Sequence, residues 1–255
     1  SKGNKNAPFV NISAAETQKI LNQAMKSSNR WAVMKSMDKS EEEIIKSFSE
    51  KAKMTVFSWN GVKDTIMTPL DSIRYYKHFL QSGLMAMEPQ TGNVKAWVGG
   101  INYKYFQYDH VGQGARQVGS TFKPFVYATA IEQLNMSPCD SIIDGPFMIR
   151  KGRHNVTADW EPKNSDNRYR GMVTLKRGLA NSINTVSAKL MDKVGPAAVV
   201  DLAHKLGVKS EITLQPSSAL GAVEITVEDM VAAYSTFANQ GVYMKPQFIS
   251  KIEDK

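Results

Sequence analysis

Residues 84–98 read LMAMEPQTGNVKAWV, and this stretch decides the fold class. Two apolar segments flank the turn-forming residues 89–93, which is the pattern of a β-hairpin. Helical patterns follow further along the chain, at residues 120–134, 174–180, 184–194, 196–206 and 227–239. A hairpin followed by helices predicts an α+β fold, because a parallel α/β fold would alternate strands and helices along the sequence.

The segments before this hairpin carry their own start signals. Capping boxes, in which a Ser side chain and a Glu three residues later satisfy free helix N–H groups, occur at Ser13 with Glu16 and at Ser40 with Glu43. The helix after Ser40 should place Ile44, Ile45 and Phe48 on one apolar face. Both boxes therefore predict short helices near the beginning of the chain.

A strand and a third helix complete this first region. Residues 54–59 predict a strand that ends at an Asn-Gly turn. Pro69 after Thr68 predicts a helix start, and we expect that helix to run to Gly83. We therefore interpret residues 1–83 as a small adaptor, too thin to be an enzyme alone, and residues 84–255 as part of a second domain.

Composition excludes several classes of protein. The chain has 255 residues, a net charge of +8 and one cysteine, Cys139, which rules out an internal disulfide framework and a multi-cysteine metal cluster. No apolar stretch approaches the roughly 18 residues needed to span a bilayer, so we expect any membrane anchor to lie outside this chain. The net positive charge fits an ordinary solvated surface, or a surface that lies beside an anionic neighbour. No zinc finger or RNA-binding signature favours nucleic acid as that neighbour.

Several familiar catalytic patterns are absent. Residues 112–114 lack the third glycine of a dinucleotide fingerprint, and residues 114–121 have Ser120 where a phosphate loop needs lysine. No Gly-x-Ser-x-Gly motif occurs. The four histidines do not have the spacing of metal ligands: His78, His110, His154 and His204. We therefore predict no metal and no nucleotide.

What remains is Ser120 and Lys123, three residues apart at the start of a predicted helix. Residues with this spacing share one helix face. A free serine hydroxyl is a poor nucleophile, and an amine whose pKa is lowered by burial could take its proton. The helix N-terminus also offers N–H groups where an oxyanion would form. Taken alone, the pair is far more typical of a capped helix with a surface lysine, because Ser-x-x-Lys occurs by chance in most proteins of this size.

A second motif, Ser182-x-Asn184, changes this interpretation. With Ser120-x-x-Lys123 it resembles the transpeptidase domain of penicillin-binding proteins, whose signature set has Ser-x-x-Lys, a Ser-x-Asn-type motif and Lys-Thr-Gly. The resemblance covers about residues 65–255, and residues 57–72 resemble the linker of class A, bifunctional members. Further similar segments are residues 87–100, 160–164 and 219–246. The fold that the resemblance implies is α+β, an antiparallel sheet with helices shared with serine β-lactamases.

The resemblance also implies roles for individual residues. Ser120 would be the acylated nucleophile, Lys123 its general base and Ser182 a proton relay to the leaving amine. Asn184 would hydrogen-bond Lys123 and the substrate backbone. Residues expected to line or support the substrate cleft are Trp160, Asn164 and Thr185.

The family's chemistry is acyl transfer without a cofactor. The implied substrates are D-Ala-D-Ala stem peptides on lipid-linked glycan strands of peptidoglycan, and β-lactams would acylate the same serine. The resemblance implies a parent protein with a glycosyltransferase domain and a membrane anchor. Its place would be the periplasm or the outer face of the bacterial inner membrane.

One departure from the family pattern matters. No Lys-Thr-Gly or Lys-Ser-Gly follows Ser182, so we expect the chain to be a piece that ends before this motif and before the later sheet strands. The hairpin at 84–98 should then have an exposed edge. Two alternatives stay open: an inactive module of the same fold that binds cell-wall polymer or a partner, and a β-lactamase, against which the adaptor argues.

Overall fold

The computed structural model of the chain describes residues 12–253. The chain divides into two compact units, one ending at Gln81 and the other beginning at Ser82, two residues before the boundary expected from the sequence. Each unit has a hydrophobic core of its own and is described by itself. Among the described residues, no helix has both the length and the apolar character needed to cross a membrane.

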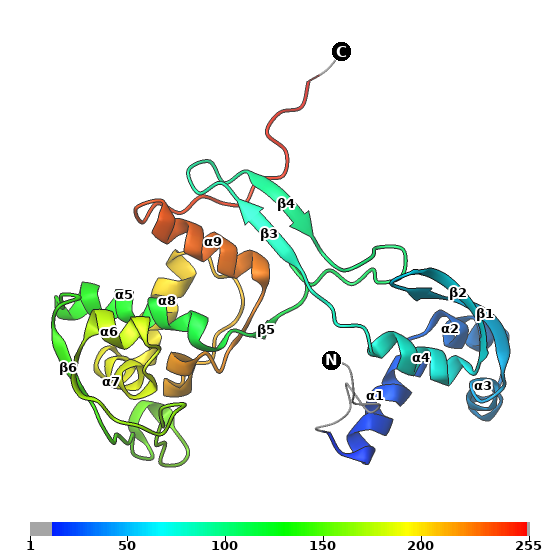
Figure 1. The fold of residues 1–255 in the computed structure, drawn as a ribbon, viewed down its shortest axis with the longest axis horizontal. Coiled ribbons are helices and arrows are strands. Elements are labelled where there is room, and N and C mark those ends of the chain that lie inside the picture. Colours follow the sequence, from blue (N-terminus) through cyan, green and yellow to red (C-terminus); the bar gives the residue numbers. More distant parts are fainter. Residues whose placement is uncertain (1–11, 254–255) are drawn as a thin grey trace. The chain divides into compact units, whose positions relative to one another are not determined.

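Within residues 12–81 the smaller unit consists of helices and one antiparallel hairpin (Figure 1). Its elements are α1 (Ala14–Lys26), α2 (Asn29–Ser36), α3 (Glu41–Ser47), β1 (Ala52–Ser58), β2 (Gly61–Met67) and α4 (Pro69–Lys77). Met25, Ile44 and Phe48 form its core, and Trp31 and Leu70 pack against them.

The predicted helix starts of the smaller unit are confirmed. Ser13 and Ser40 each form a complete capping box, and the Thr68 side chain accepts from Asp71 N at the start of α4. Helix α2 was not predicted, although the Ser28 side chain caps it by accepting from Trp31 N. Its residues lack a periodic apolar stripe, and none of them is buried.

Two expectations for this unit are wrong. Helix α4 ends at Lys77 instead of Gly83, because the chain turns there and the Phe79 ring packs edge-on against Phe57, 5.1 Å between centroids. Ile45 is 45% exposed. Ile44 and Phe48, four residues apart, enter the core, whereas Ile45 lies about 100° further round the helix from Ile44 and points toward solvent.

The larger unit places its helices around α5 (Figure 1). Its elements are β3 (Leu84–Met87), β4 (Val94–Val98), β5 (Arg116–Gln117), a 3₁₀ turn (Gly119–Phe122), α5 (Lys123–Leu134), β6 (Ser141–Asp144), a short 3₁₀ turn (Arg153–Asn155), β7 (Gly171–Thr174), α6 (Leu175–Ala180), α7 (Asn184–Val194), α8 (Pro196–Lys205), a 3₁₀ turn (Pro216–Leu220), β8 (Glu224–Ile225) and α9 (Val227–Ala238). The predicted helices are confirmed to within a few residues, except that residues 119–122 form a 3₁₀ turn before α5.

The strands of the larger unit pair antiparallel as β3 with β4, β5 with β8 and β6 with β7. The hairpin at 84–98 is therefore confirmed, and α9 lies alongside it (Figure 1). Leu84 and Val98 on this hairpin are 55% and 50% exposed. The extended segment after α9 meets its turn, where Gln247 N donates to Gly92 O at 2.8 Å.

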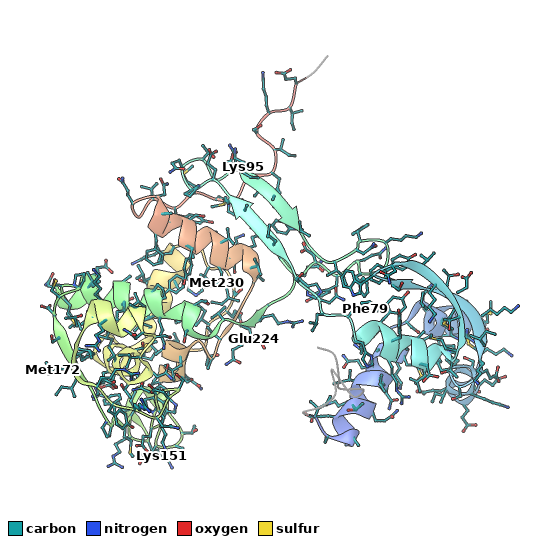
Figure 2. The ribbon with its side chains drawn as sticks, in the orientation of Figure 1. Phe79, Lys95, Lys151, Met172, Glu224 and Met230 are labelled. Atoms are coloured by element: carbon teal, nitrogen blue, oxygen red, sulfur yellow. The ribbon has the colours of Figure 1, made fainter. Side chains whose placement is uncertain are left out.

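Strands β6 and β7 alternate between the core and solvent. Ile142 and Val173 point into the core, whereas Ile143 and Met172 are more than half exposed. Met172 is labelled at the edge of the larger unit in Figure 2. Strand β6 was not predicted, because it lies in the stretch 137–171, which is rich in Pro, Gly, Asp and Asn. The pair matters because Asp144, its last residue, leads directly into the candidate site.

Candidate active site

Ser120 lies in the 3₁₀ turn that precedes α5, with its side chain exposed. The backbone on its N-terminal side is held by the 221–225 segment: Val118 N donates to Val223 O and Gly119 N to Gly221 O, both at 3.1 Å. No side-chain hydrogen bond holds the Ser120 hydroxyl within residues 12–253. The hydroxyl is therefore free to meet an incoming ligand.

Gly221 makes this anchoring possible. Its φ of +73° is one that L side chains rarely adopt, and a Cβ there would overlap the carbonyl oxygen of Gly119. The backbone of Gly221 thus lies directly against the residue before Ser120. Glycine is required at this position for both reasons.

Lys123, the first residue of α5, is buried, with 1% of its surface exposed. Its Nζ donates to Ser182 O at 2.6 Å, to Asn184 Oδ1 at 2.7 Å and to Ser182 Oγ at 3.0 Å. The structure thus brings together three of the four residues expected to act in catalysis. Ser120 stands one turn earlier on the same chain segment, without a direct hydrogen bond to Lys123.

Burial lowers the pKa of Lys123 to about 8. All three partners of its Nζ are neutral oxygens, and no ion pair with a carboxylate is found for it among the described residues. A carboxylate would hold the ammonium charged. The surroundings of Lys123 instead allow an appreciable neutral fraction near neutral pH.

Ser182 sits in the connection between α6 and α7 with φ of +52°, a left-handed conformation that costs a non-glycine residue free energy. The connection is fixed on both sides, because Ser182 N donates to Leu179 O and Ile183 N to Gly178 O, both at 2.9 Å. This backbone aims both the carbonyl and the hydroxyl of Ser182 at Lys123.

Asn184 is the first residue of α7 and has a fixed amide orientation. Its Oδ1 accepts from Lys123 Nζ, and its Nδ2 donates to Lys163 O at 2.8 Å. Because one side of the amide faces a donor and the other an acceptor, the flipped amide would lose both bonds. Asn184 is therefore a rigid acceptor for Lys123.

The three residues expected at the cleft fall in different places. Asn164 and Thr185 are buried and contact Asp144. The Thr185 side chain is fully buried and its hydroxyl donates to Asp144 at 2.6 Å, so Thr185 supports the site from within, and a contact with substrate stays a prediction. Trp160 pairs its backbone with Ile149, and a contact of its ring with substrate stays a prediction.

Sequence reasoning missed Asp144, a carboxylate with 1% of its surface exposed. Burial raises its pKa, but hydrogen bonds from Thr185, Asn164 and the Arg170 backbone outweigh burial and hold the pKa below its usual value. Asp144 stands before a Gly-Pro pair in an irregular stretch, where an aspartate is typical of a turn. No motif distinguished it.

An apolar groove of about 560 Å³ lies between β5, β8 and α9. Thr121 lines it, and Tyr234 Oη donates to Thr121 O at 2.7 Å. Lys123, Ser182 and Asn184 do not line this groove. Val118 and Thr121, on either side of Gly119 and Ser120, do line it. Across residues 12–253 no group of three or more His, Cys, Asp or Glu side chains is arranged to hold a metal ion.

An exposed serine one turn before a buried lysine, with a second serine and an asparagine hydrogen-bonded to that lysine, is an arrangement that could support nucleophilic catalysis by the serine. The sequence matches the penicillin-binding protein transpeptidase domain over residues 82–255 and the penicillin-binding protein middle domain over residues 4–80. The chain belongs to the penicillin-binding protein transpeptidase family.

Curated relatives agree with this assignment. The chain is 39% identical over 180 residues to penicillin-binding protein 1A of Aquifex aeolicus, covering 69% of the chain and 24% of that protein. It is also 39% identical over 176 residues to penicillin-binding protein 1A of Neisseria flavescens, covering 69% of the chain and 22% of that protein. The chain thus spans about a quarter of the length of these relatives.

Solved structures share the fold. The crystal structure of penicillin-binding protein 1A from Haemophilus influenzae has a TM-score of 0.64 and 32% identity, over 68% of this chain and 26% of that one. The PonA1 protein from Mycobacterium tuberculosis, in complex with penicillin V, has a TM-score of 0.56 over 88% of this chain and 60% of that one. At 22% identity this second likeness bears on the fold alone. The predicted α+β transpeptidase fold is confirmed.

Proposed function

We propose that the chain carries the acylation site of a peptidoglycan D,D-transpeptidase, with Ser120 as nucleophile. The observation that carries the proposal is the position of Lys123, buried beside an exposed serine and held by Ser182 and Asn184. Family membership supports the substrate class, because the matched domain is a transpeptidase domain. The activity of the whole parent protein is part of the same proposal.

The chemistry begins with neutral Lys123. As the Ser120 hydroxyl attacks the carbonyl carbon of the penultimate D-Ala, Lys123 takes its proton and an Oγ–C bond forms. The amide C–N bond then breaks, and terminal D-Ala leaves as an amine that receives a proton through Ser182. An amine from a second stem peptide attacks the acyl-Ser120 ester, releases the serine and completes the crosslink. No cofactor takes part.

Ser120 and Lys123 must approach each other for this step. Hydrogen bonds of catalytic groups are often long or absent without substrate and tighten in the complex. Ser120 is exposed, and its hydroxyl makes no hydrogen bond within residues 12–253 that would hold it away from Lys123. A β-lactam would react by the same attack on its ring carbonyl, and the opened ring would stay attached to Ser120. We place this activity at the outer face of the inner membrane, where peptidoglycan is assembled.

The test is covalent labelling of the purified chain with a fluorescent penicillin. We expect one label per chain, lost in Ser120→Ala and retained in Ser49→Ala, an exposed serine of the smaller unit. Mass spectrometry of the digested chain should locate the label on Ser120. An unlabelled wild-type chain that binds purified cell-wall polymer would overturn the proposal and favour a scaffold. Rapid turnover of nitrocefin would favour a β-lactamase.

A further inference from the structure

Asp144, the last residue of β6, is a buried carboxylate that the proposed chemistry does not use. We propose that Asp144 is a positioning residue, which fixes the amide of Asn164 and through it holds Asn184 against Lys123. The proposal rests on the proposed function only for the chemical role of Lys123. Its geometric content stands on the contacts of the described residues.

Four donors converge on the Asp144 carboxylate. Its Oδ1 accepts from Thr185 Oγ1 at 2.6 Å and Asn164 Nδ2 at 2.8 Å, and its Oδ2 accepts from Arg170 N at 2.9 Å and the Arg170 guanidinium at 3.5 Å. Lys189 is the other charged group near it, and its Nζ donates to Ile143 O. The hydrogen-bonding capacity of the Asp144 carboxylate is thus met mainly by groups that it orients. Replacing this buried acceptor would leave its donors unpaired, which costs free energy of folding.

Because an ionised carboxylate can only accept hydrogen bonds, Asp144 determines which way Asn164 faces. The amide must direct its NH₂ group toward Asp144, and this NH₂ also donates to Arg168 O at 2.8 Å. The carbonyl oxygen of Asn164 must then point the other way. There it accepts from Asn184 N at 3.0 Å and Thr185 N at 3.2 Å.

These two N–H groups belong to the first turn of α7, where a helix has no partners of its own for them. Such groups are usually satisfied by a Ser, Thr, Asp or Asn side chain at the N-cap. The N-cap of α7 is Ile183, which makes no side-chain hydrogen bond. Asn164 supplies the cap from a distant segment, and Asp144 holds that cap in the correct orientation.

The end of this chain of contacts is the catalytic lysine. Asn184, whose N–H is held by Asn164, accepts from Lys123 Nζ at 2.7 Å. With an asparagine at position 144, the residue could donate as well as accept, and Asn164 could turn over. Its NH₂ would then face the N–H groups of α7, donor against donor. We therefore expect Asp144→Asn to loosen the first turn of α7 and the seat of Lys123.

The test compares Asp144→Asn, Thr185→Val and Thr185→Ser with the control Asp159→Asn. Asp159 is an exposed aspartate of the same region that pairs with Arg150 and lies outside this set of contacts. Hydrogen exchange by NMR should show the Asn184 and Thr185 amides exchanging about tenfold faster in Asp144→Asn, the equivalent of one lost hydrogen bond. Amides in the middle of α7 should keep their protection.

A second readout is the NMR titration of Lys123, assigned with Lys123→Arg. We expect its midpoint to move below the wild-type value in Asp144→Asn, because the ammonium loses a well-placed acceptor. Thr185→Val should show both the faster exchange of the Asn184 and Thr185 amides and the lower midpoint of Lys123. Thr185→Ser should show neither change, because serine keeps the hydroxyl. Thr185→Val also serves if Asp144→Asn does not fold. Unchanged exchange and titration, or exchange that rises equally throughout α7, would overturn the positioning role.

These readouts need no catalysis, so the two proposals can fail separately. If wild-type chain is not labelled by penicillin but the Asn184 and Thr185 amides respond to Asp144→Asn, the proposed function fails and the positioning role stands. If wild type is labelled and neither readout responds, the positioning role fails alone. If the proposed function and the positioning role both hold, the rate of penicillin labelling should fall in Asp144→Asn and be preserved in Asp159→Asn.

Discussion

At the scale of single residues, the decisive feature is a buried lysine whose partners are all uncharged. Lys123 donates to two oxygens of Ser182 and one of Asn184. These bonds orient the amine, while burial lowers its pKa to about 8. The orientation of the amine thus comes from its hydrogen bonds, and its lowered pKa comes from burial.

The first prediction concerns pH. Because neutral Lys123 is the proposed base and its pKa is about 8, the rate of penicillin labelling should rise from pH 6 and level off above about pH 8.5. Stopped labelling reactions across this range measure it. Lys123→Arg, which cannot deprotonate, should lose about a hundredfold in rate or more. A rate that stays flat between pH 6 and 9 would rule out Lys123 as the base.

The same pKa has a consequence for stability. A lysine whose folded pKa lies below its unfolded value of about 10.4 binds fewer protons in the folded state. The free energy of unfolding should therefore gain a favourable contribution as pH rises from about 8 toward 10. Lys123→Met should remove this contribution.

The second prediction concerns Gly221, whose φ is positive and whose missing Cβ leaves room for Gly119. Gly221→Ala should destabilise the larger unit by about 1–3 kcal/mol and slow labelling about tenfold or more, because the nucleophile's backbone must shift. Gly241→Ala is the matched control. Its φ is +89°, yet nothing lies within 4 Å of its Cβ position. Equal labelling rates in the two variants would contradict the anchoring role.

At the scale of elements, caps decide where the helices begin. Ser13, Ser40 and Thr68 all accept from the N–H three residues on, as their sequence spacing indicates. Such signals are local, so they can be read from a few residues. Helix α7 is the contrast, because its cap comes from Asn164.

The third prediction tests the Ser40 cap. Ser40→Ala should lower the free energy of unfolding of the smaller unit by about 1 kcal/mol, because Glu43 N loses its acceptor. Urea unfolding followed by tryptophan fluorescence measures it. Ser36→Ala, in the last turn of α2, should change the same free energy by less than about 0.5 kcal/mol. An equally large loss of unfolding free energy in Ser36→Ala would contradict a specific contribution from the Ser40 cap.

The same contrast explains what the sequence could predict. The hairpin at 84–98, the caps and the main helices depend on local patterns and are confirmed. Strands β2 and β6 were missed because Lys63 and Asp64 interrupt one apolar run and β6 is four residues long. Ser182 and Asn184 were placed beside Lys123 by family resemblance, since nothing local links segments so far apart. Neither a local pattern nor the family resemblance pointed to Asp144.

At the scale of the whole molecule, each unit has a separate core. Ile44 belongs to one, and Leu190 to the other, the core around the site. Each unit also carries its own fluorescence probes, Trp31 and Trp59 in the smaller and Trp97 and Trp160 in the larger. A change in one core should therefore be seen first in that unit.

The fourth prediction follows. Ile44→Ala should destabilise the smaller unit by about 2–5 kcal/mol through the cavity it leaves, while the labelling rate of Ser120 stays within about twofold. Leu190→Ala should lower both the stability of the larger unit and the labelling rate. Unfolding of single-tryptophan variants and the labelling assay measure these effects. Loss of labelling in Ile44→Ala would show that the site depends on the smaller unit.

The contacts around Lys123 have a further consequence for the newly made chain. Its partners lie 59 and 61 positions later in the sequence, and the Tyr234 hydroxyl that holds Thr121 lies 113 positions later. During synthesis Ser120 and Lys123 emerge from the ribosome long before these partners. Until the partners have emerged, the lysine is an ordinary solvated, protonated amine. If Ser120 is the nucleophile, as proposed, it stays inert in the nascent chain, and its labelling by penicillin would report that folding around it is complete.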